Sequence, residues 1–147
     1  NTCRSPLGDA LLRRALATRG VADVVVESAG TGAMDGAPAS EGSVLVAMEH
    51  GLDLTRHRAR LLTPALAQAA DLVLTMSAQH LDRARGLGAG ERAHVLGEYA
   101  GREPANAEVP DPFGAALESY RDTYDVLEAL TDAVAARIAA GRADERR

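Results

Sequence analysis

Apolar positions near the start of the chain follow the spacing of a helix. They recur every three or four residues and so fall on one face: Leu7, Leu11, Ala15 and Leu16. Ser5 suits the cap of such a helix, Pro6 its first position and Gly20 its end. The pattern predicts a helix that packs one face on a core and presents its N-terminus to solvent or to a ligand.

Two more segments have helical periodicity. The first, residues 40–50, ends at Gly51. Its inward positions are Val44, Leu45 and Met48. The second is a long final helix with a charged tail over 142–147, which we expect to be frayed. Its apolar stripe consists of Tyr120, Tyr124, Leu127, Val134 and Ile138.

Short apolar runs alternate with the helices. Residues 21–28, 72–74 and 93–96 are predicted strands, and shorter helices are expected after Pro64 and over 78–85. Alternation of strands and helices is typical of a parallel sheet with ligands at the carboxyl ends of its strands. The predicted fold class is therefore α/β, a three-layer sandwich in which helices flank a short central parallel sheet.

The N-terminal residues have the composition of a phosphate-binding loop. Arg4 offers a guanidinium for bidentate contact, and Ser5 and Pro6 open a helix whose first N–H groups face an anion. A plain helix cap explains Ser5 and Pro6 equally well. Because such loops normally follow a central strand, we expect a first strand, of about four, just upstream of Asn1. Residues 1–147 are thus expected to be a single domain that lacks its N-terminal segment.

Composition narrows the classes of function. A net charge of -5, with no run of basic residues, argues against nucleic acid as the main partner, and no apolar run has membrane-spanning length. The arginines of 56–60 are typical of solvated surface. The four histidines lack metal-ligand spacing, so no metal is predicted. Cys3 is the single cysteine, which favours a reducing compartment, and we expect a cytoplasmic protein.

Four motifs occur in a characteristic order and spacing. They are Asn1 to Pro6, Ser28 to Gly32, His50-Gly51 with His57 to Arg60, and Asp111-Pro112-Phe113-Gly114. Together they resemble the low-molecular-weight protein phosphatases, and the resemblance covers essentially the whole chain. This family carries a Cys-x5-Arg-Ser loop and an Asp-Pro motif before its last helix. The resemblance implies an enzyme that needs no cofactor, acts on phosphorylated proteins and releases inorganic phosphate.

The resemblance also assigns catalytic roles. Arg4 is expected to hold the phosphoryl group, and Asp111 to act as general acid and then as base. Counting back six positions from Arg4 places the family's nucleophilic cysteine three residues before Asn1. Cys3 corresponds to the loop's second cysteine, which in many members can pair with the nucleophile under oxidation. Cys3 as a small buried packing residue is an equally good interpretation.

The remaining site predictions concern binding and loop shape. The residues expected to bind substrate or phosphate are Thr2, Cys3, Arg4, Ser5 and Phe113. A network that holds the loop is expected from Asn1, Ser28 and His57. Residues 31–38 would form one wall of the cleft and Phe113 the opposite wall. Alternative interpretations are a turn opener for Asp111, a surface histidine for His57 and a core position for Phe113.

Several details favour one branch of the family. Thr2 stands where tyrosine-directed members usually carry an apolar, branched residue, whereas members that resemble bacterial protein-arginine phosphatases carry Thr. The segments 96–99 and 111–114 match that branch as well, and no aromatic residue lies near Met34 to stack on a phosphotyrosine ring. We therefore predict phosphoarginine as the substrate group, with phosphotyrosine as the alternative.

Two other classes of function were weighed. A thioredoxin-coupled arsenate reductase shares the loop, but its thiol relay needs further cysteines, and none follows Cys3. A binding module would use Arg4 and the helix N-terminus to hold phosphate or a phosphoprotein without hydrolysis. An enzyme is favoured over a binding module, because a natural binding module without the central strand and half of the loop would have an exposed core.

Overall fold

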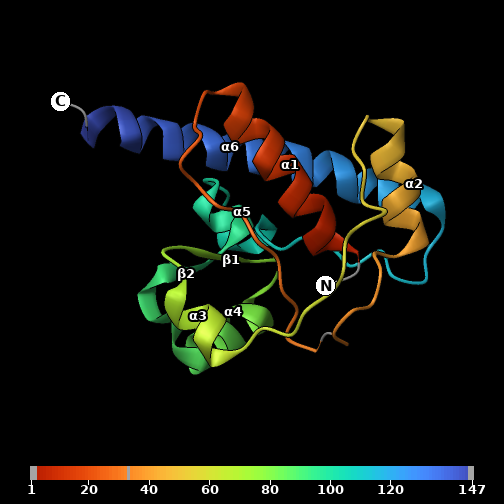
Figure 1. The fold of residues 1–147 in the computed structure, drawn as a ribbon, viewed down its shortest axis with the longest axis horizontal. Coiled ribbons are helices and arrows are strands. Elements are labelled where there is room, and N and C mark those ends of the chain that lie inside the picture. The colour runs from red at the N-terminus through yellow and green to blue at the C-terminus, as the bar shows by residue number, and fades with distance from the viewer. Residues whose placement is uncertain (1–2, 33, 146–147) are drawn as a thin grey trace.

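A small parallel sheet lies between two groups of helices. The computed structural model describes residues 3–32 and 34–145, so the predictions for Asn1 and Thr2 lie outside the described residues. Helices α1 (Arg4–Thr18) and α6 (Leu117–Glu145) pack together on one side of the sheet. Helices α3 (Pro64–Ala69) and α4 (Ala78–Ala84) lie on the other side (Figure 1). The predicted α/β class, with helices flanking a parallel sheet, is confirmed.

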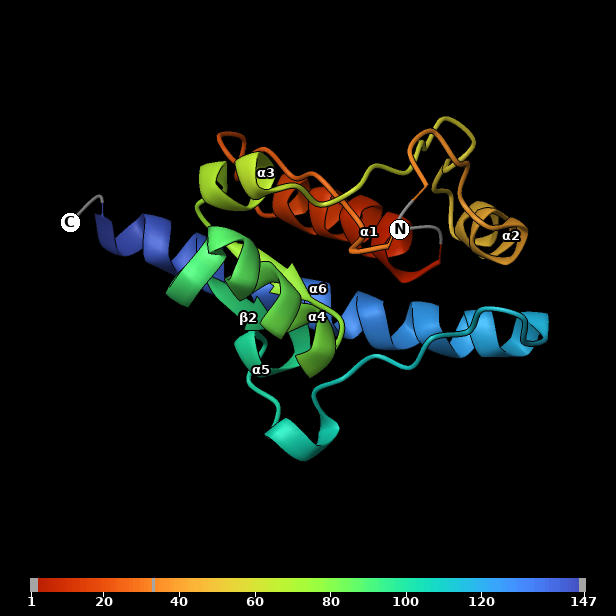
Figure 2. The same ribbon diagram turned by 90° about the horizontal axis from the view of Figure 1, so that it is seen from below.

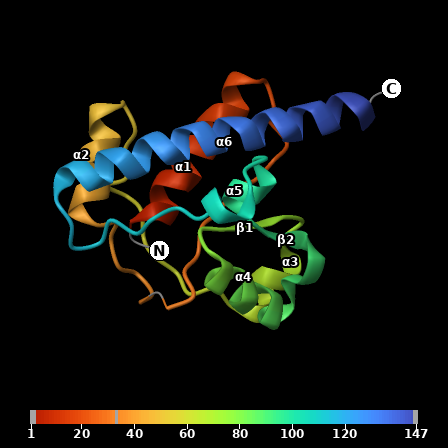
Figure 3. The same cartoon turned by 180° about the vertical axis from the view of Figure 1, so that it is seen from behind.

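The sheet of the described residues has two strands. They are β1 (Val73–Thr75) and β2 (Ala93–Val95), paired in parallel with Leu74 opposite His94. Both predicted strands, 72–74 and 93–96, are correct to within one residue. The sheet is narrower than the expected four strands, and its carboxyl edge leads into α4 and α5 (Leu96–Tyr99). Figure 3 shows α5 between this sheet and α6.

The strand predicted over 21–28 does not form in the described structure. The segment is extended but outside any sheet, and Val25 is 84% exposed. Two guanidinium groups bond its carbonyls in place of a neighbouring strand: Arg13 donates to Val26 and Arg60 to Ser28. The prediction was wrong because β-branched composition favours a strand only where another backbone edge pairs with it.

Helices α1 and α2 (Glu41–Glu49) agree with the predicted periodicity, apart from details of their ends and faces. Helix α1 begins at Arg4 with Cys3 as its cap residue, so Ser5 and Pro6 lie inside the first turn rather than at the cap and first position. In α2 the buried residues are Ser43, Val46 and Ala47. Of the predicted inward residues, Val44 is half-buried and packs against the core, whereas the prediction was wrong for Leu45 and Met48, which are exposed.

The final helix is longer than predicted. Helix α6 continues to Glu145, and Arg142 forms an ion pair with Asp23 at 2.9 Å. Fraying of the tail from residue 142 stays a prediction. The connecting turns are η1 (Arg85–Ala89), η2 (Gly90–Arg92) and η3 (Pro104–Asn106). Among the helices of the described chain, none combines the length and apolarity that a membrane span requires.

The main core joins α1, α2 and α6. Its most deeply buried side chains are Leu7, Leu11, Val46, Tyr124, Leu127 and Val134. The predicted stripe of α6 is confirmed, with Ile138 half-buried at its end. A smaller cluster of alanines packs α3 and α4 against β2. In Figure 2 the N-terminal end of α1 lies beside the loop that precedes α2, which brings the predicted phosphate loop close to α2.

Candidate functional site

The guanidinium of Arg4 lies against the segment that carries the Asp-Pro motif. Its Nη1 donates a hydrogen bond of 2.6 Å to the carbonyl of Val109, and its Nη2 lies 4.0 Å from Oδ2 of Asp111. The Arg4 side chain is only 15% exposed. Residues more than a hundred positions apart are thereby brought together at the N-terminus of α1, where backbone N–H groups favour an anion.

Val109 links this contact to the sheet. Its N–H donates to the carbonyl of Met76, which directly follows β1, at 3.0 Å. Upstream in the same segment, Ala107 packs on Gly97 of α5 so closely that a Cβ atom at position 97 would lie 2.1 Å from the Ala107 carbonyl oxygen. Both contacts fix the segment, so Asp111 is held at a defined position relative to Arg4.

Asp111 makes two different contacts. Its Oδ1 accepts a hydrogen bond of 3.1 Å from the N–H of Phe113, and Oδ2 faces Arg4. The carboxylate therefore opens the turn at Pro112, as the interpretation of Asp111 as a turn opener predicts. It also remains 55% exposed, so a proton can be exchanged with a ligand or with water.

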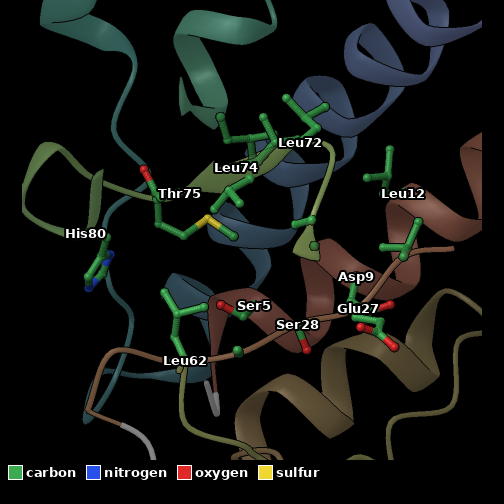
Figure 4. Close-up of a pocket in the computed structure, with 18 of the residues that line it drawn as sticks. Ser5, Asp9, Leu12, Glu27, Ser28, Leu62, Leu72, Leu74, Thr75 and His80 are labelled. Atoms are coloured by element: carbon green, nitrogen blue, oxygen red, sulfur yellow. The ribbon is translucent and has the colours of Figure 1, made fainter. Parts of the chain in front are cut away.

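These residues line a cavity of about 830 Å³. Its wall at the loop end includes Arg4, Ser5, Thr31, Asp111 and Phe113. Figure 4 shows Ser5 and Ser28 on one side and Thr75 and His80 on another. Phe113 is 73% exposed, which excludes its core interpretation and leaves its ring at the mouth of the cavity.

The cavity extends away from the loop between two backbone edges. One edge is the extended segment Val24–Val26, and the other is β1 with Leu72 before it. Neither has a strand partner on the side of the cavity within the described residues. Leu72 and Leu74 line this part in Figure 4. Most side chains along the two edges are apolar, although Asp23 and Asp71 beside them also line the cavity, whereas the loop end is polar.

Cys3 is buried at the start of α1. Its Sγ lies 3.8 Å from the hydroxyl of Tyr120, and its carbonyl accepts a hydrogen bond of 2.9 Å from Ser43. Ser5, the second residue of α1, lines the cavity close to the guanidinium of Arg4. The loop end thus rests on α2 and α6 as well as on its own helix.

Ser28 and His57 share a second, smaller cavity of about 300 Å³. The Arg60 side chain stands between the two cavities: it donates to the Ser28 carbonyl at 3.0 Å and pairs with Glu27 at 3.0 Å. The sequence analysis treated Arg60 as a surface residue. Its bond to Ser28 was missed because the acceptor is a backbone carbonyl, which no side-chain pattern identifies.

His80 is a site residue that the sequence analysis did not select. It lies in α4, lines the loop end of the cavity and is half-buried. Burial, followed by the positive charge of Arg4, lowers the pKa of His80, while Asp111 and Glu108 act in the opposite direction. Its imidazole is therefore neutral at neutral pH. A lone histidine on a short helix carries no signal in the sequence.

The acid–base groups of the site are not arranged as metal ligands. Within residues 3–32 and 34–145, no three His, Cys, Asp or Glu side chains lie close enough to hold a metal ion. What the site does offer is one clamped guanidinium, a helix N-terminus and a facing carboxylate. Together these define an α/β domain whose site has the groups that an oxyanion such as phosphate would need, with a carboxylate beside them.

Comparison with known proteins identifies the family. The model of the low molecular weight phosphotyrosine protein phosphatases matches residues 1–143. The chain therefore belongs to this family of enzymes.

Some similar proteins are named tyrosine phosphatases and others arginine phosphatases. The chain is 34% identical over 140 residues to EpsP of Ralstonia solanacearum, a probable low molecular weight protein-tyrosine-phosphatase, covering 95% of this chain and 91% of EpsP. The YwlE arginine phosphatase of Geobacillus stearothermophilus superposes with a TM-score of 0.87 at 32% identity, over 98% of this chain and 90% of YwlE. The tyrosine phosphatase Wzb of Escherichia coli K30, in complex with sulphate, superposes with a TM-score of 0.83 at 33% identity, over 94% of this chain and 92% of Wzb.

Proposed function

We propose that this protein is a cysteine-dependent phosphatase that hydrolyses phosphoarginine on proteins through a cysteinyl-phosphate intermediate. One observation carries the proposal: the guanidinium of Arg4, clamped at the N-terminus of α1, faces the carboxylate of Asp111 at 4.0 Å in a shared cavity. This arrangement places an anion-binding group beside a carboxyl group that can serve as proton donor, so both can reach one phosphoryl group.

In the first step a cysteine thiolate attacks phosphorus in line with the leaving group. Two phosphoryl oxygens are held by Arg4 in bidentate contact, with N–H groups of α1 on the third. The bond from phosphorus to the guanidino nitrogen breaks as the bond to sulfur forms. Asp111 transfers its proton to that nitrogen, so arginine leaves with its hydrogen restored and Asp111 becomes a carboxylate.

In the second step water cleaves the cysteinyl phosphate. The Asp111 carboxylate accepts a proton from the water as its oxygen attacks phosphorus, and the phosphorus–sulfur bond breaks. Inorganic phosphate is released, the thiolate is restored and Asp111 is again protonated. The exposure of Asp111 supports both roles, because it allows contact with the leaving group and then with water.

The proposal includes a segment ahead of Asn1. Family spacing from Arg4 places the nucleophile three residues before Asn1, and a preceding strand would lead into it. The apolar part of the cavity, between Val24–Val26 and β1, supports this strand, because both backbone edges are open to a partner there. An extended strand in this position would join β1 to the valine segment and end at the N-terminus of α1.

Phosphoarginine is favoured by the character of the cavity wall. Among the described residues that line it, Phe113 is the only phenyl or phenol side chain, and its ring is mostly exposed. A phosphotyrosine ring gains most from aromatic stacking, whereas a guanidino group does not depend on an aromatic wall. Similarity to the YwlE arginine phosphatase supports the same branch.

Phosphotyrosine is the second candidate. EpsP and Wzb, which are similar over almost the whole chain, are named tyrosine phosphatases. Wzb is in complex with sulphate, a tetrahedral oxyanion like phosphate, which is compatible with either candidate. The two candidates share every catalytic step and differ only in the leaving group.

The two substrates can be compared directly. With a polypeptide that carries the cysteine three positions before Asn1, we expect kcat/KM to be about tenfold higher on a phosphoarginine peptide than on the matching phosphotyrosine peptide. A preference for phosphotyrosine would replace the first candidate by the second. Phosphate binding without turnover on either peptide would instead indicate a binding module.

The role of Asp111 has its own test. Asp111→Asn removes the transferable proton but keeps the turn contact to Phe113, so kcat is expected to fall by about 100- to 10,000-fold with phosphate binding retained. Asp122→Asn changes an exposed carboxylate on α6 and serves as the control. Unchanged turnover in Asp111→Asn would remove this residue from the mechanism.

A further inference from the structure

Two serines at the start of α2 face the phosphate loop instead of capping their own helix. Ser40 is the cap residue of α2, yet its side chain makes no capping bond to that helix. Its Oγ lies 3.1 Å from the Oγ of Ser43, one turn further on, which is fully buried. A serine inside a helix usually bonds to its own backbone. Ser43 donates instead to the carbonyl of Cys3, at 2.9 Å.

The bonds continue around Cys3 to α6. The Tyr120 hydroxyl lies 3.8 Å from the Cys3 sulfur and also bonds the side chain of Ser40. Burial, and then the bond to Cys3, raises the pKa of Tyr120, so its phenol keeps its proton. The hydroxyls of Ser43, Ser40 and Tyr120 therefore form a hydroxyl ring with Cys3, closed through both the sulfur and the carbonyl of Cys3.

Packing fixes this hydroxyl ring in place. The aromatic ring of Tyr120 lies so close to Gly42 that a Cβ atom there would be 2.7 Å from three of its carbons. Helices α2 and α6 are thus in contact at Gly42, which lies between Ser40 and Ser43 in the sequence. Because buried hydroxyls have few alternative partners, this geometry keeps Ser43 directed at the Cys3 carbonyl.

The Cys3 carbonyl belongs to the same peptide group as the N–H of Arg4. Arg4 is the first residue of α1, so its N–H has no partner inside the helix. Such an N–H at a helix N-terminus is available to an anion. A donor on the carbonyl side of a peptide fixes the peptide plane and strengthens the N–H as a donor. We propose that Ser43 is a positioning residue, which orients the Cys3–Arg4 peptide so that its N–H binds a phosphoryl oxygen.

This inference rests on the proposed function, because it assumes that phosphate binds at Arg4. It adds a role that the catalytic steps do not include: Ser43 acts through the loop peptide and touches no ligand. Ser40 and Tyr120 support Ser43, so their removal is expected to have the same effect in a weaker form.

The test measures binding of inorganic phosphate to the whole chain by calorimetry, together with amide spectra of 15N-labelled protein. In Ser43→Ala we expect the phosphate Kd to rise about 3- to 10-fold, the range given by loss of one hydrogen bond. The Arg4 amide resonance is expected to move upfield in the free protein and to respond less to phosphate. Ser40→Ala and Tyr120→Phe are expected to show smaller changes of the same sign.

Thr131→Ala is the matched control. Thr131 is also a buried hydroxyl that donates to a backbone carbonyl, that of Leu127 at 2.7 Å, but it lies within α6. It is expected to lose a similar amount of stability with phosphate Kd unchanged within about twofold. If Ser43→Ala does not fold, Ser40→Ala and Tyr120→Phe decide the question by the same two readouts.

The outcomes distinguish failure of this inference from failure of the proposed function. Wild-type Kd and an unmoved Arg4 amide in Ser43→Ala, with lowered stability, would make Ser43 a purely structural residue and overturn the inference. Failure of the wild-type chain to bind phosphate at all would overturn the proposed function first, and this inference with it.

Discussion

The two ends of the main cavity are built differently. At the loop end, Arg4 is bonded to Val109, faces Asp111 and is backed by buried hydroxyls from α2 and α6. At the other end, Val24–Val26 faces β1 across open space, and Val25 is almost fully exposed. One end is held by specific polar contacts between distant elements, and the other has apolar edges without a partner among the described residues.

The difference shows what each kind of element needs in order to form. Helix α1 completes its backbone hydrogen bonds within itself, so its N-terminus is available as a binding site wherever its apolar face can pack. An extended segment completes its bonds only with a neighbour, and here the carbonyls of Val26 and Ser28 instead accept bonds from the side chains of Arg13 and Arg60. We therefore expect the loop end to bind an anion even where the sheet is narrow.

Removal of the Arg4 guanidinium should have the largest effect on the loop end. Arg4→Ala takes away both the bidentate donor and the partner of the Val109 carbonyl. We expect phosphate affinity, measured by calorimetry, to fall about 100-fold, with a smaller loss in Arg4→Lys, which keeps the charge without the planar fork. Arg19→Ala removes an exposed ion pair to Asp132 and should leave affinity unchanged. Equal effects at positions 4 and 19 would show that only overall charge matters.

Gly97→Ala should disturb the backbone that holds Asp111. The new methyl group would overlap the Ala107 carbonyl, which lies 2.1 Å from its position, so α5 and the following segment must separate. We expect the free energy of unfolding to fall by about 2–3 kcal/mol in chemical denaturation, with weaker phosphate binding. Gly86→Ala has open space around it and should change stability by less than about 0.5 kcal/mol. A tolerated Gly97→Ala would mean that the segment is not held by this contact.

Paired valine variants compare the core near the loop with the open end directly. Val46 of α2 is fully buried, so Val46→Ala should lower the free energy of unfolding by about 2 kcal/mol, as a core truncation does. Val25→Ala removes an exposed side chain and should cost less than about 0.5 kcal/mol. A loss near that of Val46→Ala would instead show that another segment covers Val25 in the folded protein, as expected if a further strand occupies the cavity.

Much of the fold could be predicted from the sequence, because helical periodicity is local. The stripe of α6 and the boundaries of α2 followed from apolar spacing and from glycine after the helix. The strand at 21–28 could not be judged in this way, since its formation depends on a neighbouring backbone edge that composition does not report.

The candidate site, like the fold, could be predicted only in part. Motif order brought Arg4 and Asp111 into one hypothesis, and the structure places them side by side. Val109 was missed because its contribution is a carbonyl, and Ser43 because its partner lies 40 positions away. Bonds between a side chain and a distant backbone group leave no periodic signal in a sequence.

His80 gives the smallest expected effect and reports on the charge of the loop end. Because its pKa is lowered in the folded protein, the folded state binds this proton more weakly than the unfolded chain does. The free energy of unfolding that depends on a neutral His80 has its full value above the ordinary pKa of 6.5. It falls as the pH drops below 6.5, until His80 of the folded protein also binds a proton. His80→Gln should therefore flatten the decline of the unfolding midpoint on acidification, without changing the midpoint at pH 8.

Phosphate should oppose this effect, because an anion beside Arg4 offsets the positive charge that contributes to the low pKa of His80. Titration of the imidazole by NMR is expected to show a higher pKa with saturating phosphate than without it. A His80 titration that is insensitive to phosphate would place the anion away from Arg4, and so would separate the polar end of the cavity from the binding site assigned to it.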